Sequence, residues 1–235
     1  MVVLVTGVGR AGQIGHAVAR GLGRTGCRIV MAGRDDAVLG THAKTFTAEG
    51  IDARGVAVDL ATQAGAGRAV AAAVTAFGGL DAVVNLAGGF GAFGPTPDVS
   101  IAAFDSMFEA NVKTAFCVSQ AAIPVLRQRG GGAIVNFASV AALTPMSPMA
   151  AYAAAKTAVA GLTRSLAREL RDDRIRVNAV APGLVRTADN VAQMGADPKA
   201  RWVELDQVVA AVHFLISPDS AAVTGQLLAV TAGDV

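Results

Sequence analysis

The chain has 235 residues, of which 53 % are hydrophobic and 16 % charged, and its formal net charge is +2. The length fits one large α/β domain, residues 1–235, and the composition excludes a disordered chain. The small charge and the lack of any run rich in lysine and arginine exclude the basic surface expected of a nucleic-acid-binding protein.

Short apolar runs typical of β-strands alternate with helical patterns along the whole chain. The runs are apolar on successive residues, as expected of strands that are buried on both faces. This alternation predicts an α/β fold with a parallel sheet and helices on both of its faces. The predicted strands are 2–5, 28–32, 55–58, 82–84, 133–137, 175–180 and 227–230, and the predicted helices are 15–25, 36–49, 62–77, 100–128, 149–171 and 206–216.

Three long segments show neither pattern, namely 86–99, 138–148 and 182–205. Each follows a predicted strand, and open α/β sheets bind ligands beyond the carboxyl ends of their strands. We therefore expect a binding site among these segments.

The first predicted strand leads into a glycine-rich loop, Thr6-Gly7-Val8-Gly9-Arg10-Ala11-Gly12-Gln13-Ile14-Gly15, before a helical pattern begins. Glycines let the backbone approach a pyrophosphate closely, and the amide groups at a helix start favour its negative charge. Glycine accounts for 27 residues of the chain, so the pattern gains its weight from its position directly after the first strand. It predicts a dinucleotide-binding site.

At the end of the second predicted strand the sequence reads Gly33-Arg34-Asp35. A guanidinium at this point suits the 2′-phosphate of NADP(H), whereas an acidic residue would hold the 2′-hydroxyl of NAD(H). Arg34, with Arg10 as a second candidate, favours NADP(H), and Asp35 leaves NAD(H) open. The structural alternative for Arg34 is an ordinary exposed arginine in a turn.

The only tyrosine of the chain, Tyr152, stands four positions before Lys156 in an alanine-rich stretch. Alanine favours a helix, and residues i and i+4 share one helical face, so we expect the two side chains within reach of each other. Ser139 follows the strand 133–137, and Asn111 lies within the predicted helix 100–128.

In this order, these motifs resemble the short-chain dehydrogenase/reductase family over essentially the whole chain, and 3-oxoacyl carrier-protein reductases are among the similar members. The resemblance implies a doubly wound Rossmann-type sheet of about seven strands and a homotetramer or homodimer. It also implies hydride transfer between a nicotinamide cofactor and a carbonyl or alcohol. The matching motifs are Thr6-Gly7 with its glycine loop, Asp59, Asn85-Leu86-Ala87-Gly88, Asn111, Ser139, Tyr152 with Lys156, and Asn178-Ala179-Val180-Ala181-Pro182-Gly183 followed by Thr187.

The chemistry gives these residues separate tasks. Hydride delivery to a ketone builds negative charge on oxygen, so the site needs a proton donor and a hydrogen bond aimed at that oxygen. Tyr152 is the candidate donor, and the ammonium of Lys156 one helical turn away should lower the pKa of its phenol. In the oxidation direction the same phenolate acts as base. By the resemblance, Lys156 also binds the nicotinamide ribose, Ser139 holds the substrate oxygen, and Asn111 anchors a water in the proton path.

The resemblance also assigns residues to the cofactor. Asp59 would accept from the adenine amino group, Asn85 would brace the central strand, and Pro182-Gly183 with Thr187 would fix the nicotinamide carboxamide. Taken singly, such residues also fit structural roles, for example a helix N-cap for Asp59 or a turn former for Ser139. The predicted cofactor-binding residues are Gly7, Arg10, Gly12, Ile14, Gly15, Arg34, Asp59, Leu60, Asn85, Ala87, Gly88, Tyr152, Lys156, Pro182, Gly183 and Thr187.

The glycine loop is two residues longer than the family pattern Thr-Gly-x-x-x-Gly-x-Gly. Which amides contact phosphate, and whether Arg10 reaches a 2′-phosphate, therefore stays open. A longer loop also resembles that of enoyl reductases, but those space the tyrosine and lysine more widely and lack the serine, so carbonyl chemistry is favoured. Leu86 and residues 231–234 also differ from the family, and we expect them to affect packing or assembly rather than the chemistry.

The segment 184–205 is shorter than the usual substrate lid of the family, which predicts an open pocket. Its candidate lining residues are Phe90, Phe93, Val140, Leu143, Met146, Met149, Leu184, Met194 and Trp202. An apolar pocket favours an apolar or acyl-chain ketone or secondary alcohol over a sugar or a charged metabolite. For each of these side chains, packing in the core or in an interface is the alternative.

Other features carry no chemistry. Cys27 and Cys117 lack metal-type spacing and are expected to be buried free thiols, and His16, His42 and His213 lack ligand spacing, so no metal is expected. No targeting signal is found, which predicts the cytoplasm. The high hydrophobic content predicts subunit interfaces and hence a homo-oligomer.

Two classes of function remain. The leading hypothesis is an NADP(H)-dependent carbonyl reductase or alcohol dehydrogenase, because a binding module has no need of a proton donor. The alternative is a non-catalytic NADP(H)-binding sensor or scaffold, which the short lid favours slightly.

Overall fold

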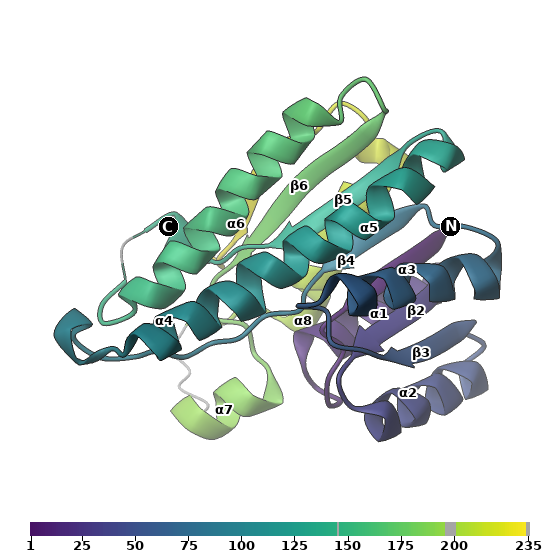
Figure 1. Ribbon diagram of the computed structural model, residues 1–235. Helices are drawn as coiled ribbons and strands as arrows, with labels where there is room; N and C mark the ends of the chain where they lie inside the picture. The colour runs from purple at the N-terminus through teal and green to yellow at the C-terminus, as the bar shows by residue number, and fades with distance from the viewer. Residues whose placement is uncertain (145, 196–200, 234–235) are drawn as a thin grey trace.

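The computed structural model describes residues 1–144, 146–195 and 201–233. Within them, seven parallel strands form one sheet in the order β3-β2-β1-β4-β5-β6-β7 (Figure 1), so the predicted doubly wound sheet is confirmed. The sheet grows in opposite directions from β1 and β4, and open α/β sheets bind ligands at this switch point. The strands are β1 (Val2–Thr6), β2 (Arg28–Gly33), β3 (Ala53–Ala57), β4 (Ala82–Asn85), β5 (Gly132–Phe137), β6 (Ile175–Pro182) and β7 (Leu227–Val230).

The helices of the described residues are α1 (Ile14–Arg24), α2 (Asp36–Ala48), α3 (Gln63–Phe77), α4 (Ile101–Phe108), α5 (Thr114–Arg129), α6 (Ala150–Glu169), α7 (Ala188–Met194) and α8 (Leu205–Ile216). Two of them differ from the prediction. The single helix expected over 100–128 is divided into α4 and α5 by a π-helical turn, Glu109–Lys113. The helix α7 lies in a segment predicted to be irregular, because its seven residues are too few to show a helical period in the sequence.

Helices cover both faces of the sheet, and the side chains of β1 alternate between them. Val3 and Val5 belong to a core that includes residues of α1, α2 and α8, whereas Val2 and Leu4 belong to a second core with α3, α5 and α6. All four side chains are fully buried. Burial on both faces explains why the strand is apolar on successive residues.

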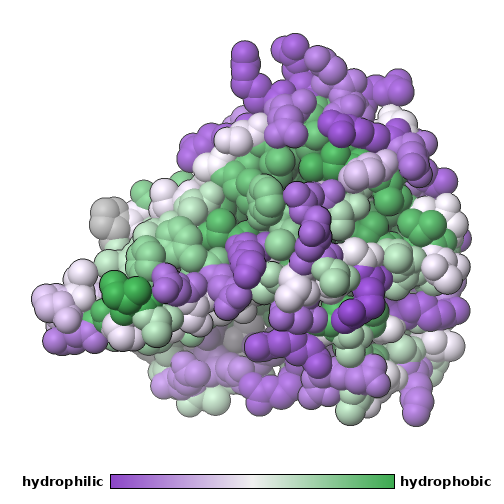
Figure 2. All heavy atoms as spheres, viewed as in Figure 1, coloured by the Kyte–Doolittle hydropathy of each residue, from purple (hydrophilic) through white to green (hydrophobic). Residues whose placement is uncertain are grey.

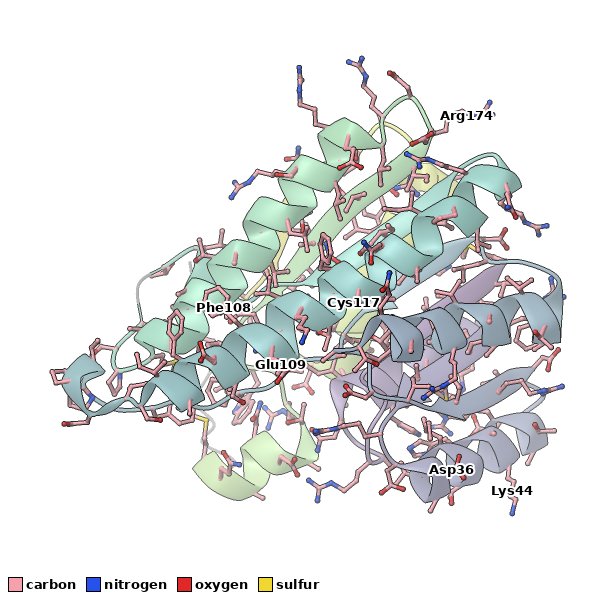
Figure 3. The ribbon with its side chains drawn as sticks, viewed as in Figure 1. Asp36, Lys44, Phe108, Glu109, Cys117 and Arg174 are labelled. Carbon is pink, nitrogen blue, oxygen red and sulfur yellow. The ribbon has the colours of Figure 1, made fainter. Side chains whose placement is uncertain are left out.

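The outer side of α5 and α6 carries a band of apolar side chains between hydrophilic margins (Figure 2). Phe116 of α5 is among the exposed large hydrophobic residues. Cys117, the next residue, is labelled in Figure 3 and is a buried free thiol like Cys27, as predicted. None of the described helices has both the length and the apolar character needed to cross a membrane.

The three irregular segments predicted from the sequence leave the carboxyl ends of β4, β5 and β6, which are neighbours in the sheet. The first two are joined by a hydrogen bond of 3.2 Å from the Gly94 amide to the Pro148 carbonyl oxygen. The third returns toward β1, where the Ala188 amide donates to the Gly12 carbonyl oxygen at 3.2 Å. Residues 196–200 of the predicted lid, and residue 234, lie outside the described residues.

Candidate active site

Tyr152 and Lys156 lie in the first two turns of α6, as their spacing predicts. The Lys156 Nζ atom is 5.8 Å from the centroid of the Tyr152 ring. It also donates a hydrogen bond of 2.9 Å to the carbonyl oxygen of Phe137, the last residue of β5. This bond holds the buried ammonium at the carboxyl edge of the sheet.

Burial dominates the electrostatics of this pair. It lowers the pKa of the Lys156 ammonium to about 8, because the charged form loses its hydration. Burial also raises the pKa of the Tyr152 phenol, and a hydrogen bond with Ser139 acts in the opposite direction. The expectation that Lys156 lowers the pKa of Tyr152 does not hold in this structure, because the phenol packs among apolar side chains, Phe90 included, and its desolvation is the larger effect.

Ser139 lies two residues beyond β5 and is buried. Its hydroxyl oxygen accepts from the Ala141 amide at 3.2 Å and caps the short 3-10 helix Val140–Ala142. It is also the hydrogen-bond partner that acts on Tyr152. The turn-forming role and the role beside the phenol are therefore combined in one side chain.

Asn111 is buried in the π-helical turn between α4 and α5. Its amide nitrogen donates to the carbonyl oxygens of Met107, at 2.9 Å, and Gly89, at 3.0 Å, and its Oδ1 atom accepts from the Gly89 amide at 3.3 Å. A Cβ atom on Gly88 would lie 2.6 Å from Asn111 Oδ1 and 3.5 Å from Lys156 Nζ. Glycine at this position thus lets the asparagine and the lysine approach the same stretch of backbone. π-helical turns occur frequently at functional sites.

The glycine loop packs directly on the segment that follows β4. Gly7 has a positive φ of 70°, and a Cβ atom there would lie 2.6 Å from the Ala87 amide nitrogen. A Cβ atom on Gly15 would collide with the Gly7 carbonyl oxygen. The hydroxyl oxygen of Thr6 accepts from the Leu86 and Ala87 amides at 3.0 and 3.1 Å. Both glycines are therefore required by close backbone contacts.

The start of α1 fits an anionic ligand. The helix begins at Ile14, no side chain caps it, and no acidic residue lies in its first turn. Its first amide groups have no partners within the helix and so remain open to a phosphate. A Cβ atom on Gly9 would meet no atom within 4 Å, which leaves space beside the loop. The residues present here fit the pyrophosphate of a dinucleotide.

The two residues at the end of β2 that could distinguish NAD(H) from NADP(H) differ in their hydrogen bonds. Asp35 caps α2, and its carboxylate accepts from the Val38 amide at 3.0 Å. Arg34 is exposed, and its guanidinium has no hydrogen bond or ion pair within the described parts of the chain. The arginine is therefore the group available to a ligand.

Asp59 follows β3 by two residues and is exposed, whereas Leu60 is buried. The Asp59 carboxylate accepts from the Ala61 amide at 3.0 Å. The N-cap of α3 is Thr62, which accepts from the Gly65 amide at 3.0 Å, so Asp59 is not the helix cap that the sequence suggests as its structural alternative.

Asn85 ends β4 and links it to its neighbours, as expected of a brace. Its amide nitrogen donates to Asn136 of β5 at 2.9 Å and to Ser119 of α5 at 3.1 Å. Asn136 in turn donates to Thr163 of α6 at 2.9 Å. This buried chain of polar groups ties the central strands to α5, which follows the turn with Asn111, and to α6, which carries Tyr152.

Pro182 ends β6, and the Gly183 amide then donates to the Val230 carbonyl oxygen of β7 at 2.9 Å. Thr187 is buried and caps α7 by accepting from the Asn190 amide at 3.2 Å. Thr187 is predicted to lie at the cofactor, and its capping of α7 is an additional role that the sequence did not indicate.

Two side chains that hold the glycine loop were not singled out for this role from the sequence. His42 of α2 is buried, as one of the alternatives for the histidines expects, and its Nε2 atom lies 2.8 Å from the Gly9 carbonyl oxygen. Asp189 of α7 forms an ion pair with Arg10 at 2.8 Å. The partners are 33 and 179 positions apart, so no local pattern could have revealed either contact.

Two exposed phenylalanines of the predicted pocket lining lie on the side of Tyr152. Phe90, which is 60 % exposed, contacts the Tyr152 ring edge-on with centroids 4.9 Å apart, and Phe93 contacts Phe90 in the same manner at 4.6 Å. Leu143, Met146 and Met194 are also exposed members of the predicted lining. Trp202 is not open to the pocket as predicted: it is buried, and the Arg186 guanidinium lies 4.9 Å from its ring centroid.

The described residues contain no group of three or more histidine, cysteine, aspartate or glutamate side chains that could hold a metal ion. The polar groups at the carboxyl edge of the sheet are instead a phenol, an ammonium, a hydroxyl and a carboxamide. Together with the glycine loop, this set defines an oxidoreductase that depends on a nicotinamide dinucleotide.

Comparisons with known proteins lead to the same class. The family model for short chain dehydrogenases matches residues 1–198, and the chain belongs to the short-chain dehydrogenase/reductase family. It is 35 % identical to 2-(S)-hydroxypropyl-CoM dehydrogenase 3 of Xanthobacter autotrophicus, over 99 % of this chain and 95 % of that protein. It is 37 % identical to the inactive 2-(S)-hydroxypropyl-CoM dehydrogenase 2 of the same organism, over 92 % and 98 %.

Solved structures share the whole fold. A variant of actinorhodin polyketide ketoreductase with NADPH matches with a TM-score of 0.89 and 32 % identity, over 99 % of this chain and 96 % of that one. A 7α-hydroxysteroid dehydrogenase complexed with NADH and 7-oxo glycochenodeoxycholic acid matches with a TM-score of 0.91 and 28 % identity, over 100 % and 94 %. The resemblance stated from the sequence is thereby confirmed at the level of family, fold and enzyme class.

Proposed function

We propose that this protein is an NADP(H)-dependent carbonyl reductase or secondary-alcohol dehydrogenase with Ser139, Tyr152, Lys156 and Asn111 as its catalytic residues. The observation that carries the proposal is the meeting of the Ser139 hydroxyl, the Tyr152 phenol and the Lys156 ammonium at the carboxyl end of β5. A nicotinamide bound at this edge supplies the hydride in reduction and accepts it in oxidation.

Proton transfer falls to Tyr152. Its hydroxyl donates a proton to the substrate oxygen as negative charge develops there, while the Ser139 hydroxyl donates a hydrogen bond to the same oxygen. The raised pKa of Tyr152 keeps the phenol protonated at neutral pH, as a donor requires. The Lys156 ammonium, with a pKa of about 8, then returns a proton to the phenolate. Asn111 contacts the Gly88–Gly89 backbone next to that ammonium and holds the path to solvent.

For the cofactor we propose the contacts predicted from the sequence. The loop from Gly7 to Gly15, with Gly12 and Ile14, would hold the pyrophosphate, and Asp59 and Leu60 would border the adenine. The nicotinamide side would be held by a set made of Ala87, Gly88, Tyr152, Lys156, Pro182, Gly183 and Thr187, and Asn85 would support it by bracing the central strand. The two cofactor-bound relatives contain NADPH and NADH, so the preference of this chain rests on its own residues. The free guanidinium of Arg34 and the capping role of Asp35 support NADP(H).

The exposed apolar side chains of the predicted lining support an apolar or acyl-chain ketone or secondary alcohol as substrate. Phe90, Phe93, Leu143, Met146 and Met194 would contact its apolar part without offering a charge. The steroid dehydrogenase of the same fold is complexed with a 7-oxo compound, 7-oxo glycochenodeoxycholic acid, which supports a ketone as the substrate class.

The enzyme is tested with NADPH and a panel of apolar ketones, polyols and sugar nucleotides, followed by the loss of nicotinamide absorbance. We expect turnover of ketones, and we expect Tyr152→Phe to reduce it by about 10²–10⁴ because the proton donor is lost. Binding of NADPH, measured by its fluorescence, should be largely retained in this variant. An unchanged rate in Tyr152→Phe would remove Tyr152 from the proposal.

A second candidate function is an NADP(H)-binding sensor or scaffold without turnover. The 37 % identity to a relative named as inactive favours it. Tight binding of NADPH with no turnover of any compound in the panel would support this function over the enzyme.

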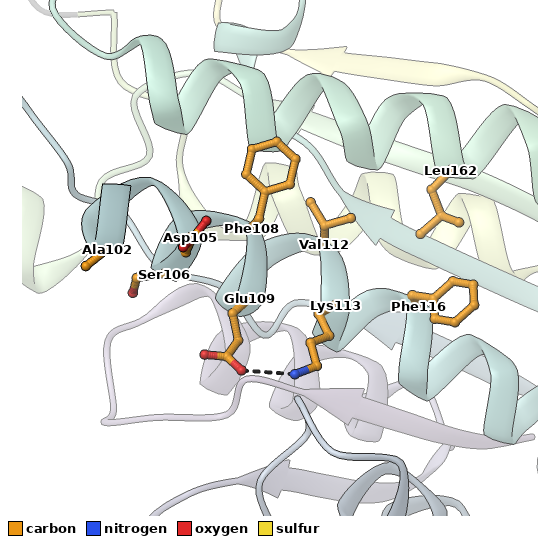
Figure 4. A pocket seen from close by; sticks show the side chains of 9 residues that line it. All are labelled: Ala102, Asp105, Ser106, Phe108, Glu109, Val112, Lys113, Phe116 and Leu162. Carbon is orange, nitrogen blue, oxygen red and sulfur yellow. Dashed lines mark hydrogen bonds and ion pairs between the residues drawn. The ribbon is translucent and has the colours of Figure 1, made fainter. Parts of the chain in front are cut away.

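We further propose a homo-oligomer, a dimer or a tetramer, in which a second copy covers the outer face of α4, α5 and α6. A groove of about 700 Å³ lies there, and Figure 4 shows Phe108 and Val112 directed toward α6, with Leu162 of α6 directed toward Phe116 of α5. Glu109 and Lys113 form an ion pair of 3.1 Å at its border. Because the border carries both signs of charge, a second copy related by a twofold axis can place each charge opposite its counterpart.

A further inference from the structure

The glycine loop and α7 are in direct contact at two points. The Arg10 guanidinium lies 3.1 and 2.8 Å from the two carboxylate oxygens of Asp189. Next to this ion pair, the Ala188 amide donates to the Gly12 carbonyl oxygen at 3.2 Å. A Cβ atom on Gly12 would lie 3.3 Å from that of Ala188, so the backbones of the two segments are closely packed.

This contact spans the functional edge of the sheet. The segment that carries α7 leaves β6, whereas the glycine loop leaves β1, and β4 and β5 lie between these two strands. Three strand spacings correspond to roughly 14 Å, which the segment 183–188 must cross. Figure 1 shows α7 below the carboxyl ends of the central strands, beside the loop that follows β1. The contact therefore closes a bridge over the ends of β4 and β5, where Gly88 and Ser139 lie.

The glycine loop is fixed on its other side by α2. The Gly9 carbonyl oxygen can only accept, so the His42 Nε2 atom 2.8 Å away must carry the proton and donate it. His42 is buried, while Arg10 and Asp189 have side chains that are 73 % and 45 % exposed. The base of the loop is thus anchored within the protein, whereas the side-chain contact at Arg10 is an exposed ion pair.

We infer that Arg10 and Asp189 form a clasp that closes the nucleotide cleft, so that the cofactor leaves only when the glycine loop and α7 separate. This inference rests on the proposed function. It makes Arg10 and Asp189 positioning residues that set the residence time of the dinucleotide. Because Asp189 engages the Arg10 guanidinium, recognition of a 2′-phosphate falls to Arg34.

The expected effect is modest and depends on salt. Exposed ion pairs are weak and screened by ions, so loss of the clasp should increase the dissociation rate by about two- to fivefold. A clasp acts on any dinucleotide in the cleft, and the increase should therefore be equal for NADPH and NADH. Direct recognition of the 2′-phosphate by Arg10 would instead affect NADPH alone.

The first experiment measures dissociation of NADPH and of NADH from the full chain by stopped-flow fluorescence. We expect Arg10→Gln and Asp189→Asn each to raise both rates by this factor, and the exchanged pair Arg10→Asp with Asp189→Arg to restore them. Added salt should raise the rates of the unchanged protein more than those of either single variant. Arg171→Gln, which breaks an exposed ion pair with Asp172 at 3.2 Å, is the matched control.

Two results of this experiment would overturn the clasp. One is that neither Arg10→Gln nor Asp189→Asn changes the dissociation rate of NADPH or NADH. The other is an increase for NADPH alone in Arg10→Gln with no effect of Asp189→Asn, which would assign Arg10 to the 2′-phosphate. Absence of any nicotinamide binding by the unchanged protein would refute the proposed function instead.

A second experiment tests the clasp without any cofactor. Hydrogen exchange is measured on the free protein for peptides covering the glycine loop and α7. Arg10→Gln should accelerate exchange in 188–194, and Asp189→Asn should accelerate exchange in 7–12, because each substitution releases the opposite segment. If each variant changes exchange only around its own position, the two segments are uncoupled and the clasp is refuted.

Discussion

Replacing Lys156 by methionine should stabilise the folded protein at neutral pH, although it removes a residue proposed for catalysis. The Lys156 ammonium is buried, and its pKa is lowered from 10.5 to about 8. The difference corresponds to a folding penalty of about 3 kcal/mol while the lysine is charged. Methionine carries no charge but leaves the Phe137 carbonyl oxygen without its partner, at a cost of about 1 kcal/mol. The net gain expected at pH 6.5 is about 2 kcal/mol.

The stability difference between Lys156→Met and the unchanged protein changes sign as the pH rises. Below pH 8 both the folded and the unfolded chain bind the Lys156 proton, and the full penalty is present. Between about pH 8 and 10.5 the folded chain has released the proton while the unfolded chain still binds it, so the stability of the unchanged protein rises with pH. Above pH 10.5 only the loss of the hydrogen bond remains, and the variant should be the less stable protein.

Urea unfolding of both proteins at pH 6.5, 8 and 9.5, at one protein concentration, measures the difference. Lys44→Met is the control, because Lys44 is exposed and points away from the body of the protein on α2 (Figure 3). The control should show no such dependence on pH. A stability difference between Lys156→Met and the unchanged protein that is constant across this range would refute a buried, shifted ammonium.

Three further substitutions test other parts of the site. Arg34→Asp should lower the preference for NADPH over NADH by about tenfold or more, because a charge-assisted contact to the 2′-phosphate becomes a repulsion. An unchanged ratio of the kcat/KM values for the two cofactors would exclude Arg34 from this role. Phe116→Glu should dissociate the proposed oligomer, because the interface on α4, α5 and α6 would then have to bury a charge. Lys44→Glu should leave the oligomer intact. Equal molar masses of the two variants in light-scattering measurements would place the interface elsewhere. Phe90→Ala should rehydrate the Tyr152 phenol and lower its raised pKa, which moves the alkaline limb of the reduction rate to lower pH. Phe93→Ala should move this limb less, because among the aromatic rings described Phe93 contacts Phe90 alone. Identical pH profiles for the two variants would contradict a pKa raised by burial.

The fold was predictable because its strands carry their own signal. Strands buried on both faces are apolar on successive residues, as in β1, and each run could be placed within a few residues. The π-helical turn at Glu109–Lys113 could not be placed, since one additional residue in a turn leaves the helical pattern on either side intact. The helix α7 was not predicted because it is too short to show a helical period in the sequence.

The site was predictable where chemistry depends on spacing along one element. Tyr152 and Lys156 are four positions apart on α6, so their proximity follows from local geometry. Ser139 lies on another segment, and its place beside Tyr152 was expected only from the resemblance to the family. The contacts of Arg10 with Asp189 and of His42 with Gly9 join segments that only the tertiary fold brings together. For the same reason the sequence could assign Arg10 to a phosphate but could not reveal the carboxylate that engages it.

The pKa values of Tyr152 and Lys156 show why a prediction of the positions of two side chains does not extend to their electrostatics. Spacing predicts that a cation lies near the phenol, but desolvation depends on side chains supplied by other segments, such as Phe90 and Met107. Burial disfavours both charged forms, so it raises the pKa of the phenol while it lowers that of the ammonium to about 8. A proton moves from the group with the lower pKa to the conjugate base of the group with the higher one. With Tyr152 as the proposed donor, transfer from Lys156 to its phenolate is therefore favourable, and burial itself sets the direction of the proposed proton path.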